Sequence, residues 1–431
     1  MEQEKTSILN DYATSSVPEE KTYSWLSMGL IWAGVGISLG LIVTGGTIGN
    51  GLGFKEATAA SFIGGFVLAA VTSICGIVGA KTHLSTAMIS SFTFGKAAIL
   101  LIALIQAFGS YGWFGIQLGL FGETVTTTVE MALGIGVPTA LCIIIGGILM
   151  ILSSTFGYKS LDLLSKIAVP LLLILLAASV YKILQGNTVQ EILDLQAPGE
   201  PITVGYGIST AIASFIVGAV VAPDVSRYAK TPKGTVGASI LAFAIVVPSM
   251  MVIGCLCAQV TGTSDIIQIM LKLGWGFAAL LVLMLAQWTS NDNNLYCAAL
   301  GFSVVFKKLK KYQITILSGI IGIALALTGI AQNLAVFLNF LGILIPPMGG
   351  VIASDFYLCH KEKYHLENLK SVKNFEIPAC TAWIAGSLIS CITTYTHVHL
   401  TTVPSIDGML IAFLVHFLWV KISKSKEEVS S

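Results

Sequence analysis

One stretch of the sequence places polar side chains in succession inside an otherwise apolar segment. Residues 286–296 are AQWTSNDNNLY. At helical spacing, four positions share one face: Ala286, Thr289, Ser290 and Asn293. Two adjacent hydroxyls and a loosened backbone offer several oxygen atoms, which are the ligands that a small hard cation such as sodium prefers. The alternative is that Thr289 and Ser290 bond only to carbonyls of the preceding turn.

Asp292 is the one acidic residue that we expect well inside an apolar segment. A charged Asp near the centre of a bilayer costs about 2.5–3.5 kcal/mol on insertion scales, so it must meet water or a partner. Asp292 could carry a proton, balance a cation, or accept hydrogen bonds from Asn side chains and from Tyr296, four residues later. We favour a structural or gating role.

A second group of residues suits a flat heterocyclic ligand. Trp113 and Gln117 are four residues apart, so on a helix they share a face. An indole offers a stacking surface, and an amide both donates and accepts hydrogen bonds. Phe215 could cover the opposite face of the ligand. Ordinary aromatic packing is the alternative for each ring, although Trp113 lies too far inside its segment for an interfacial belt.

The composition indicates the elements that must hold these residues. Of the 431 residues, 55% are hydrophobic and 10% are charged, and the net charge is +1. Soluble domains carry about 25% charged residues, and this balance gives no reason to expect a nucleic acid partner. The 8 cysteines contain no CxxC pair, so we interpret them as reduced thiols.

The apolar residues form runs of the length that crosses a bilayer, about 20 residues. Barrel strands would alternate apolar and polar residues, and residues 143–152 do not, so the runs are expected to be helices. We predict twelve spans, near 26–49, 57–80, 97–122, 132–154, 162–183, 204–223, 236–260, 270–303, 313–331, 334–357, 376–395 and 400–421.

The basic residues predict the orientation of these spans. With a cytoplasmic N-terminus, the outer connections hold only Lys55, Lys182 and Lys272, and the other 20 of the 23 basic residues lie inside. Cytoplasmic loops are rich in Lys and Arg. We therefore expect a multi-pass protein of the cell membrane with both termini, residues 1–24 and 422–431, in the cytoplasm.

Two predicted spans are rich in glycine, which weakens a helix interior by about 1 kcal/mol per residue. They are the first, at residues 32–47, and the sixth, at residues 205–218 followed by Pro223. Close packing of helices through small residues is one explanation. Interrupted spans at matching places in two five-helix halves instead indicate an inverted repeat with its binding site at the midplane. We expect both spans to be broken.

Other features carry less information. His397 and His399 resemble a weak metal pair, but they lie in a short outer loop without a third ligand, so we do not expect a metal there. Pro346–Pro347 should break the tenth span, either as a packing kink or as a gate hinge. Asp224 with Arg227, and Asp355, are expected to make polar contacts at the inner side. The sequence has no phosphate-binding loop and no nucleophile–base arrangement, which argues against ATP drive and against an enzyme.

These segments resemble the nucleobase–cation symporter family over about residues 25–360. The resemblance is carried by TGGTIGNGL at 44–52, GWFG at 112–115, SFI at 214–216, WTSNDN at 288–293, and IPPMGGVI at 345–352 with Asp355. It implies an all-α membrane fold with a 5+5 inverted repeat of the leucine-transporter type at 25–357. It further implies two additional helices within 358–421.

The resemblance also implies the roles of particular residues. The carbonyls of Gly34, Ile37 and Ala286 and the hydroxyls of Thr289 and Ser290 match a sodium site. The substrate would lie between Trp113 and Phe215, in contact with Gln117 and Asn291.

Two positions depart from cytosine permeases, which have Gln at Ser110 and Asn at Ala286. The carbonyl of Ala286 keeps the cation site possible, but the base-recognition set is altered at Ser110. The cargo is therefore open among cytosine, another pyrimidine such as hydroxymethylpyrimidine, a purine and a hydantoin-like ring. We expect a monomer in the lipid bilayer that imports this ring with sodium and uses no organic cofactor. The alternatives are proton coupling through Asp292, and a channel or a receptor.

Overall fold

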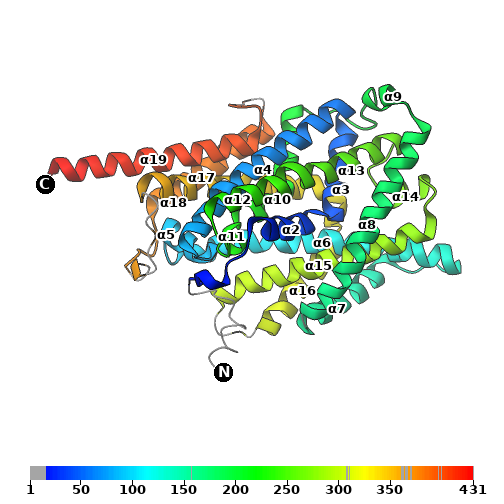
Figure 1. Cartoon of the computed structure of the whole chain (residues 1–431), viewed down its shortest axis with the longest axis horizontal. Coiled ribbons are helices and arrows are strands. Elements are labelled where there is room, and N and C mark those ends of the chain that lie inside the picture. Colours follow the sequence, from blue (N-terminus) through cyan, green and yellow to red (C-terminus); the bar gives the residue numbers. More distant parts are fainter. Residues whose placement is uncertain are drawn as a thin grey trace.

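The computed structural model describes residues 16–430 except 157, 307, 308, 310, 361–363, 365, 366, 369, 370, 397 and 399. Its regular elements in that part are helices, most of which run along one common direction (Figure 1). The short helices are η1 (Glu19–Lys21), α5 (Thr86–Phe94), α9 (Val189–Leu193), α14 (Ile266–Lys272) and η3 (Ile330–Asn333).

The other helices form three groups by their packing. The first group has α2 (Trp25–Gly36), α3 (Leu39–Gly51), α4 (Phe54–Thr82), α10 (Val204–Val220), α11 (Pro223–Ser226), α12 (Pro232–Ser239), the π-helical η2 (Ile240–Val246) and α13 (Val247–Thr261). Here α3 packs on α13, α10 on α4, and α2 on α12 and η2. Both halves of the first predicted span therefore lie along one neighbouring helical run.

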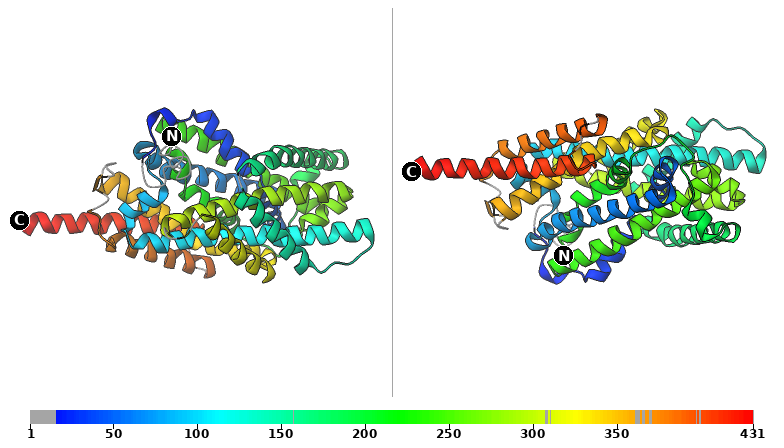
Figure 2. Two further views of the ribbon diagram at one scale, coloured as in Figure 1. Left: turned by 90° about the horizontal axis from the view of Figure 1, so that it is seen from below. Right: turned by 90° about the horizontal axis from the view of Figure 1, so that it is seen from above.

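The second group has α6 (Ala98–Leu133), α7 (Thr139–Phe156), α8 (Tyr158–Gly186), α15 (Gly276–Val305) and α16 (Lys311–Leu327). In it, α6 packs on α7, α15 and α16. The third group has α17 (Leu334–Ala353), the π-helical η4 (Ser354–Cys359), α18 (Ile377–Tyr395) and α19 (Pro404–Ser430). It joins the first group through α10 and α17, and α19 extends beyond the other helices at one end (Figure 2).

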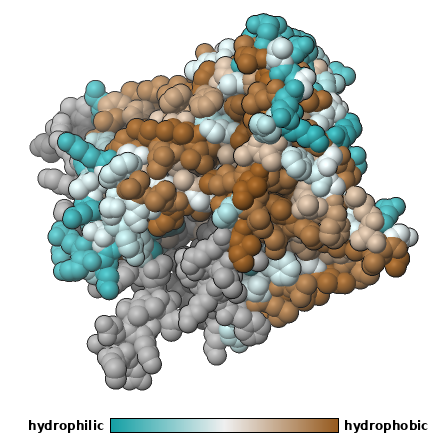
Figure 3. Space-filling model, turned by 45° about the vertical axis from the view of Figure 1, so that its right-hand side comes forward, coloured by the Kyte–Doolittle hydropathy of each residue, from teal (hydrophilic) through white to brown (hydrophobic). Residues whose placement is uncertain are grey.

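The surface of the bundle is suited to lipid. Large apolar side chains are exposed on the outer helices, including Leu30, Phe66, Ile174, Ile320 and Leu388, each at least 56% exposed. Exposed apolar surface on this scale marks contact with something other than water. Figure 3 shows hydrophobic side chains across much of one face, with hydrophilic ones toward its upper right and lower left.

Helices lie over each of the twelve predicted ranges. Among the described residues, seven helices are long and apolar enough to cross a membrane, or eight if the bent pair α2–α3 is one span. The protein is therefore an all-helical, multi-pass membrane protein. The number twelve stays a prediction.

The expected break in the first span is present. Helices α2 and α3 meet at 60°. Ile37 leaves helical geometry with φ −83° and ψ 77°, and Ser24 caps the start of α2 by accepting a hydrogen bond from Ser27 N–H. The Ser38 N–H donates to the Gly36 carbonyl at 3.0 Å instead of to the Gly34 carbonyl four residues back.

The sixth span corrects our expectation, because α10 is continuous through its glycines and turns only at Val221, before Pro223. A Cβ on Gly205 would collide with the Thr402 carbonyl, so this glycine serves close packing. In the tenth span, α17 is not interrupted and continues through Pro346 and Pro347. A packing kink or a gate hinge at these prolines stays a prediction.

Candidate functional site

The first and second helix groups meet where Trp113 of α6 lies against α3. A Cβ on Gly40, three residues after Ile37, would stand 3.0 Å from Cζ3 of Trp113. The Trp113 ring also meets Phe337 of α17 edge to face, at 5.6 Å between centroids. Trp113 keeps part of its surface exposed. One indole therefore touches the broken span on one side and leaves another side available.

The polar residues predicted for the substrate lie on α6 and α15, which pack closely. Gln117 is 4% exposed and Asn291 is 0% exposed. The Asn291 amide donates to the Phe114 carbonyl at 3.0 Å. Among the described residues, Gln117 Oε1 and Asn291 Oδ1 are buried acceptors without a hydrogen-bond partner. Ser110 shares the α6 face of Trp113 and Gln117 and is partly exposed.

Phe215 lies on α10, in the first helix group. Its ring covers Gly218 one turn later and meets Phe243 of η2 at 5.1 Å, tilted by 67°. Phe243 in turn meets Trp32 of α2 at 4.9 Å. Phe215 is thus tied by aromatic contacts to the half of the first span that precedes the break. Trp113 belongs to the opposing group.

Residues predicted for the cation lie on both sides of the junction. Gly34 is exposed, with no atom within 4 Å of where a Cβ would stand, and Ile37 occupies the break. On α15, which contacts α3 directly, the Thr289 hydroxyl donates to the Ala286 carbonyl at 3.0 Å. Ser290 is partly exposed. Thr289 therefore makes the bond to the preceding turn that was the alternative to cation binding.

Asp292 is 1% exposed and is held by hydroxyl groups of α7. Ser153 donates to both carboxylate oxygens, at 2.8 and 2.9 Å, and Ser154 donates to Oδ1 at 2.9 Å. The indole N–H of Trp288 donates to the Ser153 oxygen at 3.2 Å. The side chains of Asn293 and Tyr296, named as partners from the sequence, lie outside the described residues. The serines are partners that the sequence alone did not suggest.

Two further residues escaped the sequence-based prediction. Gln287 is 0% exposed, donates to the Thr124 hydroxyl at 3.3 Å, and has a buried Oε1 without a described partner. Its place inside the polar stretch 286–296 was the signal that could have found it. Gly40 was one of many glycines in the first span, and only its contact with Trp113 distinguishes it.

The Arg227 side chain donates to the Asp224 backbone carbonyl at 3.1 Å, while the Asp224 carboxylate accepts from Thr86 N–H at 2.8 Å. Asp355 makes polar contacts at the end of α17, as expected. His397 and His399 lie outside the described residues.

Comparison with known proteins shows the family to which the chain belongs. Residues 16–415 match the family described as permease for cytosine/purines, uracil, thiamine, allantoin. The chain is 31% identical to the cytosine permease of Escherichia coli (strain K12) over 355 residues, which cover 82% of this chain and 83% of that one. It is 22% identical to the hydantoin permease of Microbacterium maritypicum over 401 residues, covering 86% and 80%.

Solved structures of Mhp1, a nucleobase-cation-symport-1 family transporter, share the fold. The closed conformation with bromovinylhydantoin bound gives a TM-score of 0.80 at 18% identity, covering 95% of this chain and 96% of that one. The inward-facing conformation gives 0.83 at 16% identity, covering 96% and 94%. The chain therefore belongs to the cytosine/purine permease family of nucleobase–cation symporters, and it is a multi-pass membrane transporter and not an enzyme.

Proposed function

We propose that the protein imports a nucleobase or a related planar heterocycle together with sodium, by alternating access. The observation that carries the proposal is a pair of buried amide oxygens without a described partner. One belongs to Gln117, one helical turn after Trp113 on α6, and the other belongs to Asn291, whose amide donates to the carbonyl of the neighbouring Phe114. A buried acceptor without a partner costs about 1–3 kcal/mol. A ring N–H that donates to either oxygen removes this cost, and the indole offers the ring a stacking surface.

The two aromatic side chains assigned to the substrate belong to different helix groups. Trp113 is on α6 and Phe215 is on α10. A flat ligand that contacts both, with Ser110 and Gln117 at its edge, would favour the arrangement in which the groups approach. Ligands shift an equilibrium between conformations only by their difference in affinity for them, so this placement supports coupling of binding to closure.

The proposed sodium ligands are likewise divided. Gly34 and Ile37 supply carbonyl oxygens at the break of the first span, and Ala286, Thr289 and Ser290 supply oxygens of α15. The Ala286 carbonyl and Thr289 hydroxyl oxygens already lie 3.0 Å apart. Oxygen ligands on both sides of the junction make sodium and substrate favour the same closed arrangement, and each then raises the affinity for the other by the same factor.

For the architecture, we propose twelve spans, a 5+5 inverted repeat in residues 25–357, and two further helices within 358–421. We propose a monomer in the cell membrane with both tails, 1–24 and 422–431, in the cytoplasm. The first described residues, at η1, and the end of α19 lie toward the same end of the bundle, while α9 lies toward the other (Figure 1).

Two measurements test the function. A thermal-shift screen of the purified chain against pyrimidines, purines and hydantoins, with and without sodium, should reveal a ring that raises the melting temperature more when sodium is present. Uptake of that ring, radiolabelled, should fall when choline replaces sodium. Equal uptake in both salts, with a dependence on pH, would favour proton coupling through Asp292. Flux that does not saturate would indicate a channel.

A further inference from the structure

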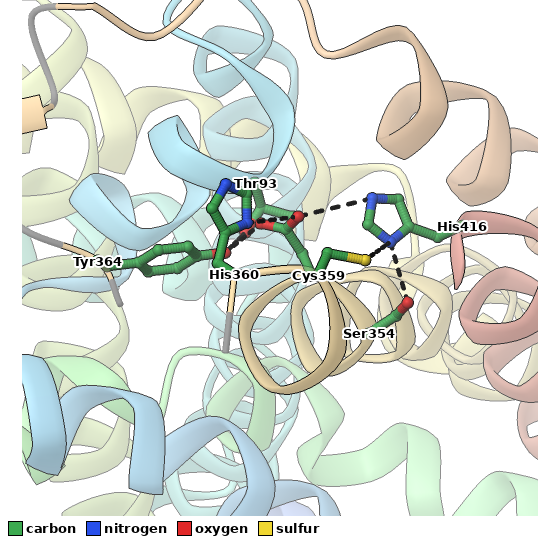
Figure 4. A network of polar contacts seen from close by, with 7 residues as sticks. Thr93, Ser354, Cys359, His360, Tyr364 and His416 are labelled. Atoms are coloured by element: carbon green, nitrogen blue, oxygen red, sulfur yellow. Dashed lines mark hydrogen bonds and ion pairs between the residues drawn. The ribbon is translucent and has the colours of Figure 1, made fainter. Parts of the chain in front are cut away.

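Three side chains of the kinds that bind metals lie close together at the end of α17, away from the place where Trp113 meets α3. Asp355 and Cys359 lie in η4, and His416 lies on α19. Asp355 is 4% exposed and His416 is 3% exposed. Figure 4 shows the side chains of Cys359 and His416 pointing toward one another from two different helices. Neither the substrate site nor the proposed cation site uses any of them.

The π-helical form of η4 brings its own residues together. The His360 N–H donates to the Asp355 carbonyl, five residues back, at 2.8 Å. The wider turn places both Cys359 and His360 beside the Asp355 side chain, whereas an α-helix would favour one of them. His360 Nδ1 lies 3.0 Å from Asp355 Oδ1. π-Helical turns of this kind occur frequently at functional sites.

His416 faces this turn with both ring nitrogens. Its Nε2 lies 3.7 Å from Asp355 Oδ1, and its Nδ1 lies 3.0 Å from the Ser354 oxygen and 3.9 Å from Cys359 Sγ. Histidines that bind a metal through one nitrogen use the other to bond a second polar group. Ser354 is therefore placed to orient the imidazole through Nδ1, which leaves Nε2, the nitrogen nearer to Asp355, to bind an ion.

The second carboxylate oxygen of Asp355 accepts a hydrogen bond from the Tyr364 hydroxyl. A carboxylate oxygen accepts, so the phenol is the donor of this bond. The Tyr364 oxygen lies 3.0 Å from the Thr93 hydroxyl, and its ring stacks on Phe92 of α5. The carboxylate is thus fixed from one side, with Oδ1 directed to the histidines.

We propose that Asp355, Cys359 and His416 bind a zinc ion that fastens α19 to the end of α17. One ligand atom from each residue lies within 4.8 Å of the other two. Tetrahedral zinc, with bonds of about 2.0 Å to nitrogen and 2.3 Å to sulfur, needs ligand atoms about 3.3–3.8 Å apart. Side-chain movements of about 1 Å close that difference.

The charges of this set suit a divalent ion. A carboxylate, a thiolate and a neutral imidazole together carry two negative charges, which zinc cancels. Uncompensated charge is costly in a buried site, so the neutral complex is favoured. A sulfur and a nitrogen ligand select zinc over magnesium or calcium, which prefer oxygen.

The site also has a route for the ion and room for a fourth ligand. A cavity of about 400 Å³ adjoins it, lined by Asp355, Cys359 and His416 and by His360 and Glu376. The His360 side chain is 49% exposed. His360 or a water molecule completes the tetrahedron.

The test uses the full chain purified in detergent and measures metal content, which does not depend on transport. After incubation with zinc and desalting, the chain should retain one zinc per molecule by mass spectrometry of the element. Cys359→Ser and His416→Gln should each lower zinc affinity at least tenfold in competition with a chelator. Cys391→Ser, on α18, is the matched control and should bind zinc as the unaltered chain does.

Binding of cobalt in place of zinc gives a second measurement. It needs no variant of His416, which is buried and whose substitution could prevent folding. Cobalt bound to a thiolate has a charge-transfer absorption in the near ultraviolet. The unaltered chain and Cys391→Ser should show this band, and Cys359→Ser should lose it. A chain that retains no zinc, or a band that persists in Cys359→Ser, overturns the proposal.

Discussion

The indole of Trp113 lies against Gly40 across the junction of two helix groups, so that a Cβ added to Gly40 would stand 3.0 Å from Cζ3 of the ring. Gly40 belongs to the half-helix that follows the break of the first span, and Trp113 belongs to the helix that also carries Gln117. The geometry of the broken span is therefore transmitted directly to the proposed stacking surface.

Substituting Gly40 tests this contact. Gly40→Val should displace the indole and raise the KM for the imported ring by tenfold or more, equivalent to about 1.4 kcal/mol. The measurement is the concentration dependence of radiolabelled uptake. Gly186→Ala is the control, because no atom lies within 4 Å of its added Cβ. An unchanged KM in Gly40→Val would mean that Trp113 does not contact the substrate.

Removing the Thr289 hydroxyl tests the cation site. Thr289→Ala should raise the sodium concentration for half-maximal uptake by about tenfold, because one oxygen ligand is lost. Thr289→Ser keeps the oxygen and should retain near-normal sodium dependence. The assay is uptake over a sodium series at constant ionic strength. Equal sodium dependence in both variants would remove Thr289 from the site.

Gln117 tests the recognition of the ring. Gln117→Leu removes a buried acceptor that lacks a described partner, so it should weaken substrate binding by about 1–3 kcal/mol while leaving stability near normal. The contrasting variant is Gln259→Leu, whose amide donates to the Gly49 and Leu52 carbonyls at 3.1 and 2.7 Å. That variant should lower the melting temperature instead. Calorimetric titration and thermal unfolding separate the two outcomes.

Asp292→Asn distinguishes a structural role from proton coupling. The amide has only one oxygen that can accept hydrogen bonds from Ser153 and Ser154. The free energy of unfolding should therefore fall by about 1.5–3 kcal/mol, which is the contribution of a hydrogen bond to a charged group. Sodium-driven uptake should persist in the protein that folds, with an unchanged pH profile. Accumulation lost in folded Asp292→Asn, together with its pH dependence, would instead support a proton carrier.

The packing of the first span on α13 yields a stability prediction. A Cβ on Gly45 would collide with the Met251 carbonyl, and Cys255 Sγ donates to the Gly45 carbonyl at 2.9 Å. Backbone atoms cannot move aside as a flexible side chain can, so Gly45→Ala should lower the free energy of unfolding by about 1–3 kcal/mol. The melting temperature measures this, and an unchanged value would mean that α3 and α13 are not packed so closely.

Local pattern sufficed where the determining interaction is local. Apolar runs predicted the positions of the long helices, and the glycines of the first span predicted a bend that the structure has at Ile37 and Ser38. In the sixth span the glycines wrongly predicted a break. Gly205 is needed there because the backbone of Thr402, which lies far along the chain, packs closely against it. The sequence does not distinguish a glycine that permits a kink in its helix from one that permits close approach of another part of the backbone.

The candidate site shows the same division. Trp113, Gln117, Thr289 and Ser290 could be proposed from helical spacing alone. The serines that hold Asp292 are separated from it by 138 and 139 residues, and no local rule connects them. His416 is likewise separated from Cys359 by 57 residues. Only the packing of distant helices brings such residues together.

The break in the first span also has a consequence for biosynthesis. At Ile37 and Ser38 the regular backbone pairing is interrupted, and lipid offers no partner for backbone groups left without one. The helical run that flanks both halves, α12 to α13, begins at Pro232, about 200 residues later. The ribosome therefore completes the first span long before its partner exists. We expect this segment to remain in contact with the insertion machinery, or to be only partly inserted in the bilayer, until the partner helices have been synthesised.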